Sequence, residues 1–217
     1  MRLRRSFSRR GLLGTVRLAA WHAAEPVRAV GLAVRERRFE ARYGVETGGN
    51  LKPWGGSLYG DAVGYAPTQP DRFDTFMALL PCDPGSLTFV DLGCGKGKAL
   101  VLAAEAGFAR AVGVEFDPEL AAVARRNLAA RGLTGDIVEL DAARFTFPDQ
   151  PLFVYLFNPF GEQTLTAVLD ALRRSYADRR RPMFLAYDNA VHRERVRREE
   201  FLSVLGEGTH WILLGAT

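Results

Sequence analysis

The fold of this 217-residue chain is decided by the stretch Phe89-Val90-Asp91-Leu92-Gly93-Cys94-Gly95-Lys96-Gly97-Lys98. Its first four residues, apolar around one aspartate, are typical of the end of a buried parallel strand. Glycine at every second position then predicts a tight turn, and the alanine- and leucine-rich run from Ala99 starts a helix. In α/β proteins, a strand, a glycine turn and a helix in this order bring backbone close to a ligand.

The sequence around this stretch alternates between expected strands and expected helices. A helix over 69–80 comes first, and Thr68 with Asp71 three residues later resembles a capping box at its start. Strands are predicted at 87–92, 109–115, 136–140, 152–157 and 182–187, and helices at 97–106, 117–131, 161–177 and about 190–201. The tail fits a closing antiparallel hairpin over 201–214, although its first part also fits a helix. This alternation predicts an α/β fold, a doubly wound and mainly parallel sheet.

Positive charge is concentrated at the amino terminus. Residues 1–42 hold eleven arginines and three glutamates, a net charge of +8, so the rest of the chain sums to −4 against a total of +4. Apolar residues recur there every three or four positions, which predicts an amphipathic helical arm divided at Pro26. Three roles fit this arm: packing on the core or over the site, a homodimer contact, or attraction to anionic lipid or an acidic partner. The stripe consists of Leu13, Val16, Ala20, Ala23, Val27, Val30 and Val34.

Three parts of the chain are therefore expected: the arm (1–42), a lid-like linker rich in glycine and aromatic residues (43–68), and a ligand-binding domain (69–217). With 47% hydrophobic and 25% charged residues, the composition is typical of a soluble globular protein. No run approaches the roughly 18 apolar residues of a membrane span. Cys82, Cys94 and the three histidines form no set with metal-ligand spacing, so we expect no metal and a cytoplasmic protein.

Two common phosphate-binding motifs do not fit the glycine turn. A P-loop needs a glycine five positions before its Gly-Lys pair, and a hydroxyl residue where Ala99 stands. The dinucleotide fingerprint needs glycine where Lys98 stands. Asp91, two residues before the first glycine, would repel a pyrophosphate but would suit the ammonium group of an amino-acid-like ligand.

The next two expected strands also end in acids. Glu115 lies about 20 residues past the glycines, where a carboxylate can accept both hydroxyls of a ribose, and Asp141 is placed to bind an adenine edge. An amino acid, a free ribose and an adenine without phosphate together describe S-adenosylmethionine. The ordered motifs 90–97, 113–115 and 141–142 resemble those of class I (seven-strand) methyltransferases. The resemblance implies a Rossmann-like seven-strand sheet and cofactor contacts from Asp91, Gly93, Gly95, Gly97, Glu115, Phe116, Asp141, Ala142 and Asn158.

The fourth strand is followed by Asn158-Pro159-Phe160, which resembles the Asn-Pro-Pro-aromatic motif of methyltransferases that act on amines, with the second proline missing. In that motif the Asn oxygen and a backbone carbonyl accept hydrogen bonds from the target amine. The resemblance therefore implies catalytic roles for Asn158, Pro159 and Phe160. Tyr187, at the end of the fifth strand, is a further candidate, with Asp188 beside it. Asn158-Pro159 also fits a simple strand-terminating turn.

Tyr65-x-Pro67-Thr68 resembles the segment with which seven-strand protein-lysine methyltransferases cover the methionine end of the cofactor. This implies that Tyr65 and Thr68 touch the cofactor; capping the following helix is the alternative. We therefore predict an enzyme that N-methylates a lysine amine of a protein. Two other functions stay open: methylation of a small metabolite, and cofactor binding without catalysis. A nucleic-acid acceptor is not expected, because the core is acidic and no recognition domain is evident.

Overall fold

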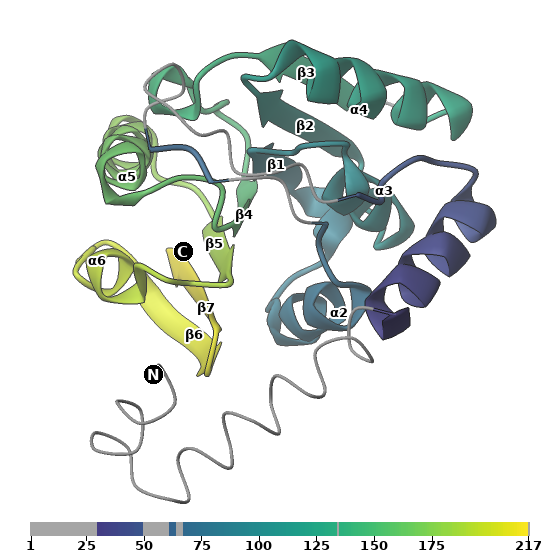
Figure 1. Ribbon diagram of the computed structural model, residues 1–217. Helices are drawn as coiled ribbons and strands as arrows, with labels where there is room; N and C mark the ends of the chain where they lie inside the picture. The colour runs from purple at the N-terminus through teal and green to yellow at the C-terminus, as the bar shows by residue number, and fades with distance from the viewer. Residues whose placement is uncertain (1–29, 50–60, 64–66, 134, 217) are drawn as a thin grey trace, which may run out of the picture. The chain divides into compact units, whose positions relative to one another are not determined.

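The computed structural model describes residues 30–49, 61–63, 67–133 and 135–216 (Figure 1). The chain divides into two compact units, 1–43 and 44–217. In the first unit, residues 30–43 are helical. Of the predicted apolar stripe, only Val30 and Val34 are described, and both are exposed. The stripe residues from Leu13 to Val27 lie outside the described residues.

The second unit is built on a seven-stranded sheet with the order β3-β2-β1-β4-β5-β7-β6. The first five strands in this order are parallel, and β7 runs antiparallel to both β5 and β6. The predicted α/β architecture and the closing hairpin are therefore confirmed. The strands are β1 (Thr88–Leu92), β2 (Arg110–Glu115), β3 (Gly135–Glu139), β4 (Leu152–Phe157), β5 (Met183–Asp188), β6 (Ser203–Gly208) and β7 (Trp211–Ala216).

Helices cover both faces of this sheet. Figure 1 shows α2, α3 and α4 on one side, and α5 and α6 on the other. Two short 3-10 turns, η1 (Pro84–Ser86) and η2 (Ala142–Arg144), precede β1 and follow β3. The helices are α2 (Pro70–Leu79), α3 (Lys98–Glu105), α4 (Pro118–Ala130), α5 (Glu162–Asp178) and α6 (Arg193–Arg197).

The two faces of the sheet bury different kinds of side chain. Because successive strand residues point to opposite faces, Val90 and Leu92 of β1 join an aliphatic core with Leu165 of α5, and Phe89 points the other way. Phe89 belongs to an aromatic layer, in which its ring lies 5.8 Å from that of Phe153. Each fully buried side chain of this size contributes about 1.5–3 kcal/mol to folding. The sheet is thus held from both sides, which keeps the carboxyl ends of its strands rigid.

Two local predictions are wrong. Thr68 does not cap α2: the residue before the helix is Gln69, its side chain makes no capping bond, and the helix starts at Pro70. Proline suits a first helical position because its missing N–H would be unpaired there anyway. Helix α6 has five residues where about twelve were expected. It ends early because the chain turns back through a hydrogen bond from Leu202 N–H to the Glu199 carbonyl and enters β6.

Arg181 ties the loop after α5 to the loop before β4. Its guanidinium donates to the carbonyls of Gln150, Pro148, Ser175 and Arg179 at 2.7–2.8 Å. The side chain is nearly buried. A planar guanidinium with five donors is the group best able to satisfy several carbonyls at once.

Candidate active site

The glycine turn adopts backbone conformations that side chains disfavour. Gly93, Gly95 and Gly97 have φ angles of 75°, 53° and 80°, a region that glycine enters without steric cost. Gly93 also permits a close approach, because a Cβ there would lie 2.3 Å from Cβ of Pro159. The turn that was predicted to bind a ligand is therefore in direct contact with the loop that was predicted to bind the acceptor.

Asp91 is a buried acid without a donor. Its side chain is 3% exposed, and no described residue donates a hydrogen bond to its carboxylate. Burial raises the pKa of Asp91 well above its ordinary value, and the charge of Glu115 raises it further. Burying a carboxylate costs folding free energy unless a cation or a hydrogen-bond donor contacts it. A positively charged ligand would therefore be stabilised next to Asp91.

Backbone N–H groups hold the carboxylate of Glu115. Its Oε2 accepts from Gly95 N–H at 2.8 Å, and its Oε1 accepts from Asp117 N–H at 3.0 Å. Burial raises the pKa of Glu115, while the backbone N–H groups of Asp117, Gly95 and Phe116 act in the opposite direction. A carboxylate has about four lone-pair sites. Three backbone donors do not fill them, so the carboxylate can still accept from a ligand hydroxyl.

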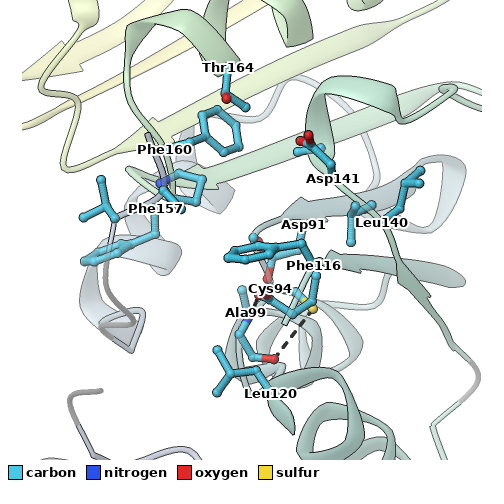
Figure 2. Close-up of a pocket in the computed structure, with 18 of the residues that line it drawn as sticks. Asp91, Cys94, Ala99, Phe116, Leu120, Leu140, Asp141, Phe157, Phe160 and Thr164 are labelled. Atoms are coloured by element: carbon cyan, nitrogen blue, oxygen red, sulfur yellow. Dashed lines mark hydrogen bonds between the residues drawn. The ribbon is translucent and has the colours of Figure 1, made fainter. Parts of the chain in front are cut away.

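These residues surround one cavity of about 430 Å³, within the range of about 300–1,000 Å³ usual for small-molecule sites. In Figure 2, Phe160 and Thr164 lie at the top of the view, Leu140 and Asp141 to the right, and Leu120 at the bottom. Asp141 both lines the cavity and caps η2 through a 2.9 Å bond from Ala143 N–H. The unpartnered Asp91, the Glu115 carboxylate and the close approach allowed by Gly93 fit S-adenosylmethionine.

Residues 158–160, which follow β4 and which we call the acceptor loop, are held from two sides. Tyr187 donates its hydroxyl proton to Asn158 Oδ1 at 2.9 Å, and Asn158 has a φ of 44°, unusual for a residue other than glycine. Residues 61–63 pair with the loop across an antiparallel bridge between Ala62 and Phe160. Within this strap (61–63), Val63 N–H donates to the Pro159 carbonyl at 2.9 Å.

Asp61 fixes the strap at the start of α5. Its carboxylate accepts from Thr164 N–H at 3.1 Å and from the Thr164 hydroxyl at 2.6 Å, and its carbonyl accepts from Gly161 N–H. These N–H groups belong to the first turn of a helix, which has no partners of its own for them. A Cβ on Gly161 would lie 2.7 Å from Asp61 Oδ2, so the absence of a side chain there lets the strap come close.

A second segment of the predicted linker, residues 44–49, lies against the glycine turn. Asn127 of α4 accepts from Glu46 N–H and donates to the carbonyls of Glu46 and Lys96 at 2.8–2.9 Å. Lys96 Nζ in turn lies 2.7 Å from Glu46 Oε1. Hydrogen bonding and charge from Lys96 keep the pKa of Glu46 below its ordinary value. That the linker acts as a lid stays a prediction.

The structure brings most of the predicted site residues together. Three described residues do not line the cavity: Gly97, Asn158 and Tyr187; Tyr65 lies outside the described residues. Sequence reasoning missed several lining residues, because nothing in their local pattern sets them apart from core or surface positions. The predicted residues at the cavity are Thr68, Asp91, Gly93, Gly95, Glu115, Phe116, Asp141, Ala142, Pro159 and Phe160. The missed ones include Asp61, Cys94, Lys98, Leu140, Arg144 and Thr164.

Within the described ranges, no group of three or more His, Cys, Asp or Glu side chains could hold a metal ion. The same part of the chain contains no helix that is both long and apolar enough to span a bilayer.

The strand order and the three acids around a glycine turn agree with the resemblance to class I methyltransferases. In a comparison with known families, residues 89–178 match the family described as "Methyltransferase domain". The match covers 90 of the 217 residues, and together with the fold and the site it supports an S-adenosylmethionine-dependent methyltransferase. A curated relative, the demethylmenaquinone methyltransferase of Thermus thermophilus, is 44% identical over 61 residues, which is 28% of this chain and 28% of that enzyme.

Two solved structures share the fold. A putative methyltransferase, yhhF, from Escherichia coli superposes with a TM-score of 0.55 at 16% identity, over 77% of this chain and 98% of that one. The 16S rRNA N2 G1207 methyltransferase of T. thermophilus, solved with AdoMet and guanosine, gives 0.53 at 18% identity, over 77% of this chain and 49% of that one. At these identities the likeness concerns the fold and not the acceptor.

Proposed function

We propose that this protein transfers a methyl group from S-adenosylmethionine to an amine, most simply the side-chain amine of a lysine in a protein substrate. The observation that carries the proposal is the unpartnered, buried carboxylate of Asp91 on the wall of the cavity that Glu115 and Asp141 also line. Bound there, the cofactor supplies a sulfonium-activated methyl group.

The residues of the chain would hold the cofactor by its polar ends. Asp91 would receive the ammonium group, and the Glu115 carboxylate would accept from the ribose hydroxyls. Asp141, which lies above Phe116 in Figure 2, would accept from the adenine amine. Holding the reacting atoms in line is most of what such a transfer requires.

The acceptor loop would orient the amine. The Pro159 carbonyl already receives the Val63 N–H, and Pro159 lines the cavity; Asn158, whose Oδ1 receives the Tyr187 proton, does not. A carbonyl oxygen accepts two hydrogen bonds, so one lone pair of the Pro159 carbonyl remains for an amine. A lysine amine has a pKa of about 10.4 in water and must lose its proton before it reacts. Desolvation between Phe157 and Phe160, which both line the cavity, would lower that pKa.

A small-molecule amine is the second candidate. The strap supports it, because residues 61–63 pair with the acceptor loop and line the cavity on that side. A lysine side chain and a small metabolite can both present an amine to this side of the cavity, so the two candidates differ in what is attached to the amine.

The first experiment is calorimetric titration with S-adenosylmethionine. Binding that Glu115→Gln weakens tenfold or more is expected, while Glu207→Gln, an exposed acid of β6, serves as the matched control. Failure of the wild-type protein to bind would end the proposal. Tritiated cofactor added with the protein to a cell lysate then separates the candidates. Label in hydrolysed protein as methyl-lysine is expected, and label confined to small molecules would select the second candidate.

A further inference from the structure

A chain of hydrogen-bonded side chains runs behind the cavity wall. Tyr155 Oη lies 3.3 Å from both Thr68 Oγ1 and Asp188 Oδ2. The other oxygen of Asp188 accepts from Asn189 N–H at 2.8 Å and lies 3.4 Å from Arg72 Nε. Of these residues only Thr68 lines the cavity. We call Asp188, Tyr155 and Thr68 the relay.

Tyr155, the middle member of the relay, lies beside Asp91. In the parallel pairing of β1 with β4, Asp91 stands directly opposite Tyr155, so the two side chains share one face of the sheet. Tyr155 is fully buried and Asp188 is 3% exposed. The Tyr155 ring packs against Phe73 and Phe89, with centroids about 6 Å apart. Phenylalanine would serve that packing equally well, so the hydroxyl needs a separate explanation.

The donors around Asp188 fix the direction of every proton in the relay. One donor, the Asn189 N–H, and the charge of Arg72 meet Asp188 Oδ1, which suits an ionised carboxylate. Burial raises the pKa of Asp188, and the Asn189 N–H and Arg72 act against that rise. An ionised Asp188 only accepts, so the single proton of Tyr155 points to it. Tyr155 Oη must then accept the proton of Thr68, which leaves the lone pairs of Thr68 Oγ1 for a donor in the cavity.

We propose that Tyr155 and Asp188 are positioning residues that present the Thr68 hydroxyl to the cavity as a hydrogen-bond acceptor, for the ammonium group held by Asp91. The inference rests on the proposed function, since it takes S-adenosylmethionine as the ligand. Neither Tyr155 nor Asp188 lines the cavity. Both act through Thr68 and change the affinity for the cofactor without touching it.

Asp188→Asn tests the proposed direction of the protons in the relay with little change in the size of the side chain. The amide oxygen will face the Asn189 N–H and the Arg72 cation at the Oδ1 position, which turns the amide N–H₂ toward Tyr155. The tyrosine proton must then point to Thr68, and the Thr68 proton points into the cavity toward the ammonium. Loss of a hydrogen bond to a charged group predicts a Kd for S-adenosylmethionine that is about 10- to 100-fold weaker. Calorimetry measures it directly, without any methyl transfer.

The decisive measurement repeats the substitution in a Thr68→Val background. With the hydroxyl gone, Asp188→Asn should change Kd less than twofold, whereas Thr68→Ser should restore the full effect. Tyr155→Phe should show the same coupling to Thr68, and it decides the matter if Asp188→Asn does not fold. Asp136→Asn, an exposed acid of β3, is the matched control. Cooperative unfolding of each variant is checked first.

The outcomes separate the two proposals. If the wild-type protein does not bind S-adenosylmethionine, the proposed function fails and the relay fails with it. If the wild-type protein binds, but Asp188→Asn weakens binding equally with and without the Thr68 hydroxyl, the relay is wrong and the proposed function stands.

Discussion

Replacing Asp91 by asparagine should have opposite effects on folding and on cofactor binding. In the free protein Asp91 is buried without a donor among the described residues, so its charge opposes folding. In the complex the same charge would face an ammonium group. The substitution keeps the size of the side chain and removes only the charge. A substitution at a residue with a purely structural role would not both raise the stability of the fold and weaken cofactor binding.

The effect on stability depends on pH in a definite direction. The folded-state pKa of Asp91 is raised above the ordinary value of about 3.9. Above pH 4 the folded chain therefore binds more protons at this residue than the unfolded chain. Stability falls as pH rises through that window, by up to about 1.4 kcal/mol per pH unit. Asp91→Asn removes this slope, so at pH 7 the variant should be more stable, with the difference vanishing near pH 4.

The effect on binding follows from the lost charge pair. Removing one partner of a buried pair costs about 2–5 kcal/mol, roughly 30- to 4,000-fold in Kd. Urea unfolding of the free protein between pH 4 and 8 and calorimetry with S-adenosylmethionine measure the two effects. Asp136→Asn, exposed on β3, should change neither. A variant that is less stable than wild type at pH 7, or that binds the cofactor as tightly, would refute the reasoning.

Three further substitutions probe the supports of the site. Gly93→Ala requires a positive φ of alanine and places a methyl group 2.3 Å from a proline carbon; calorimetry should detect no cofactor binding, and wild-type affinity would contradict the contact. Arg181→Ala should lower the free energy of unfolding by about 3–5 kcal/mol, because several carbonyls lose their donor; urea unfolding measures this, and the exposed Arg180→Ala should stay within about 0.5 kcal/mol. Asn127→Ala should speed amide hydrogen exchange in residues 45–49, and unchanged exchange would mean that other contacts hold this segment.

Much of the fold could be predicted because its signals are local. Leu152–Phe157 begins and ends as expected, since an unbroken apolar run between a proline and Asn158 leaves little choice. The meeting of Asp91 and Glu115 could also be predicted, because the ends of adjacent parallel strands lie at one edge of the sheet. Short periodic signals and strand topology were sufficient for both.

The relay and the strap could not be predicted, because their contacts join residues far apart in sequence. In the sequence, Tyr155 looks like one more apolar strand residue. Only the strand order places it opposite Asp91. Asp61 bonds to Thr164, 103 positions away, and no periodic pattern marks it. The capping role of Thr68 was wrongly predicted for the same reason: the local sequence pattern suggests a cap, whereas the side chain lies against Tyr155 on β4.

The contact between Gly93 and Pro159 has a consequence for how the two substrates influence each other. A ligand that shifts the glycine turn by a few tenths of an ångström is expected to shift the acceptor loop too, because the Pro159 ring packs directly on Gly93. When one ligand changes the binding free energy of another, the effect is reciprocal. Whatever factor the bound cofactor applies to the dissociation constant of the methyl acceptor, the acceptor must apply the same factor to the dissociation constant of the cofactor.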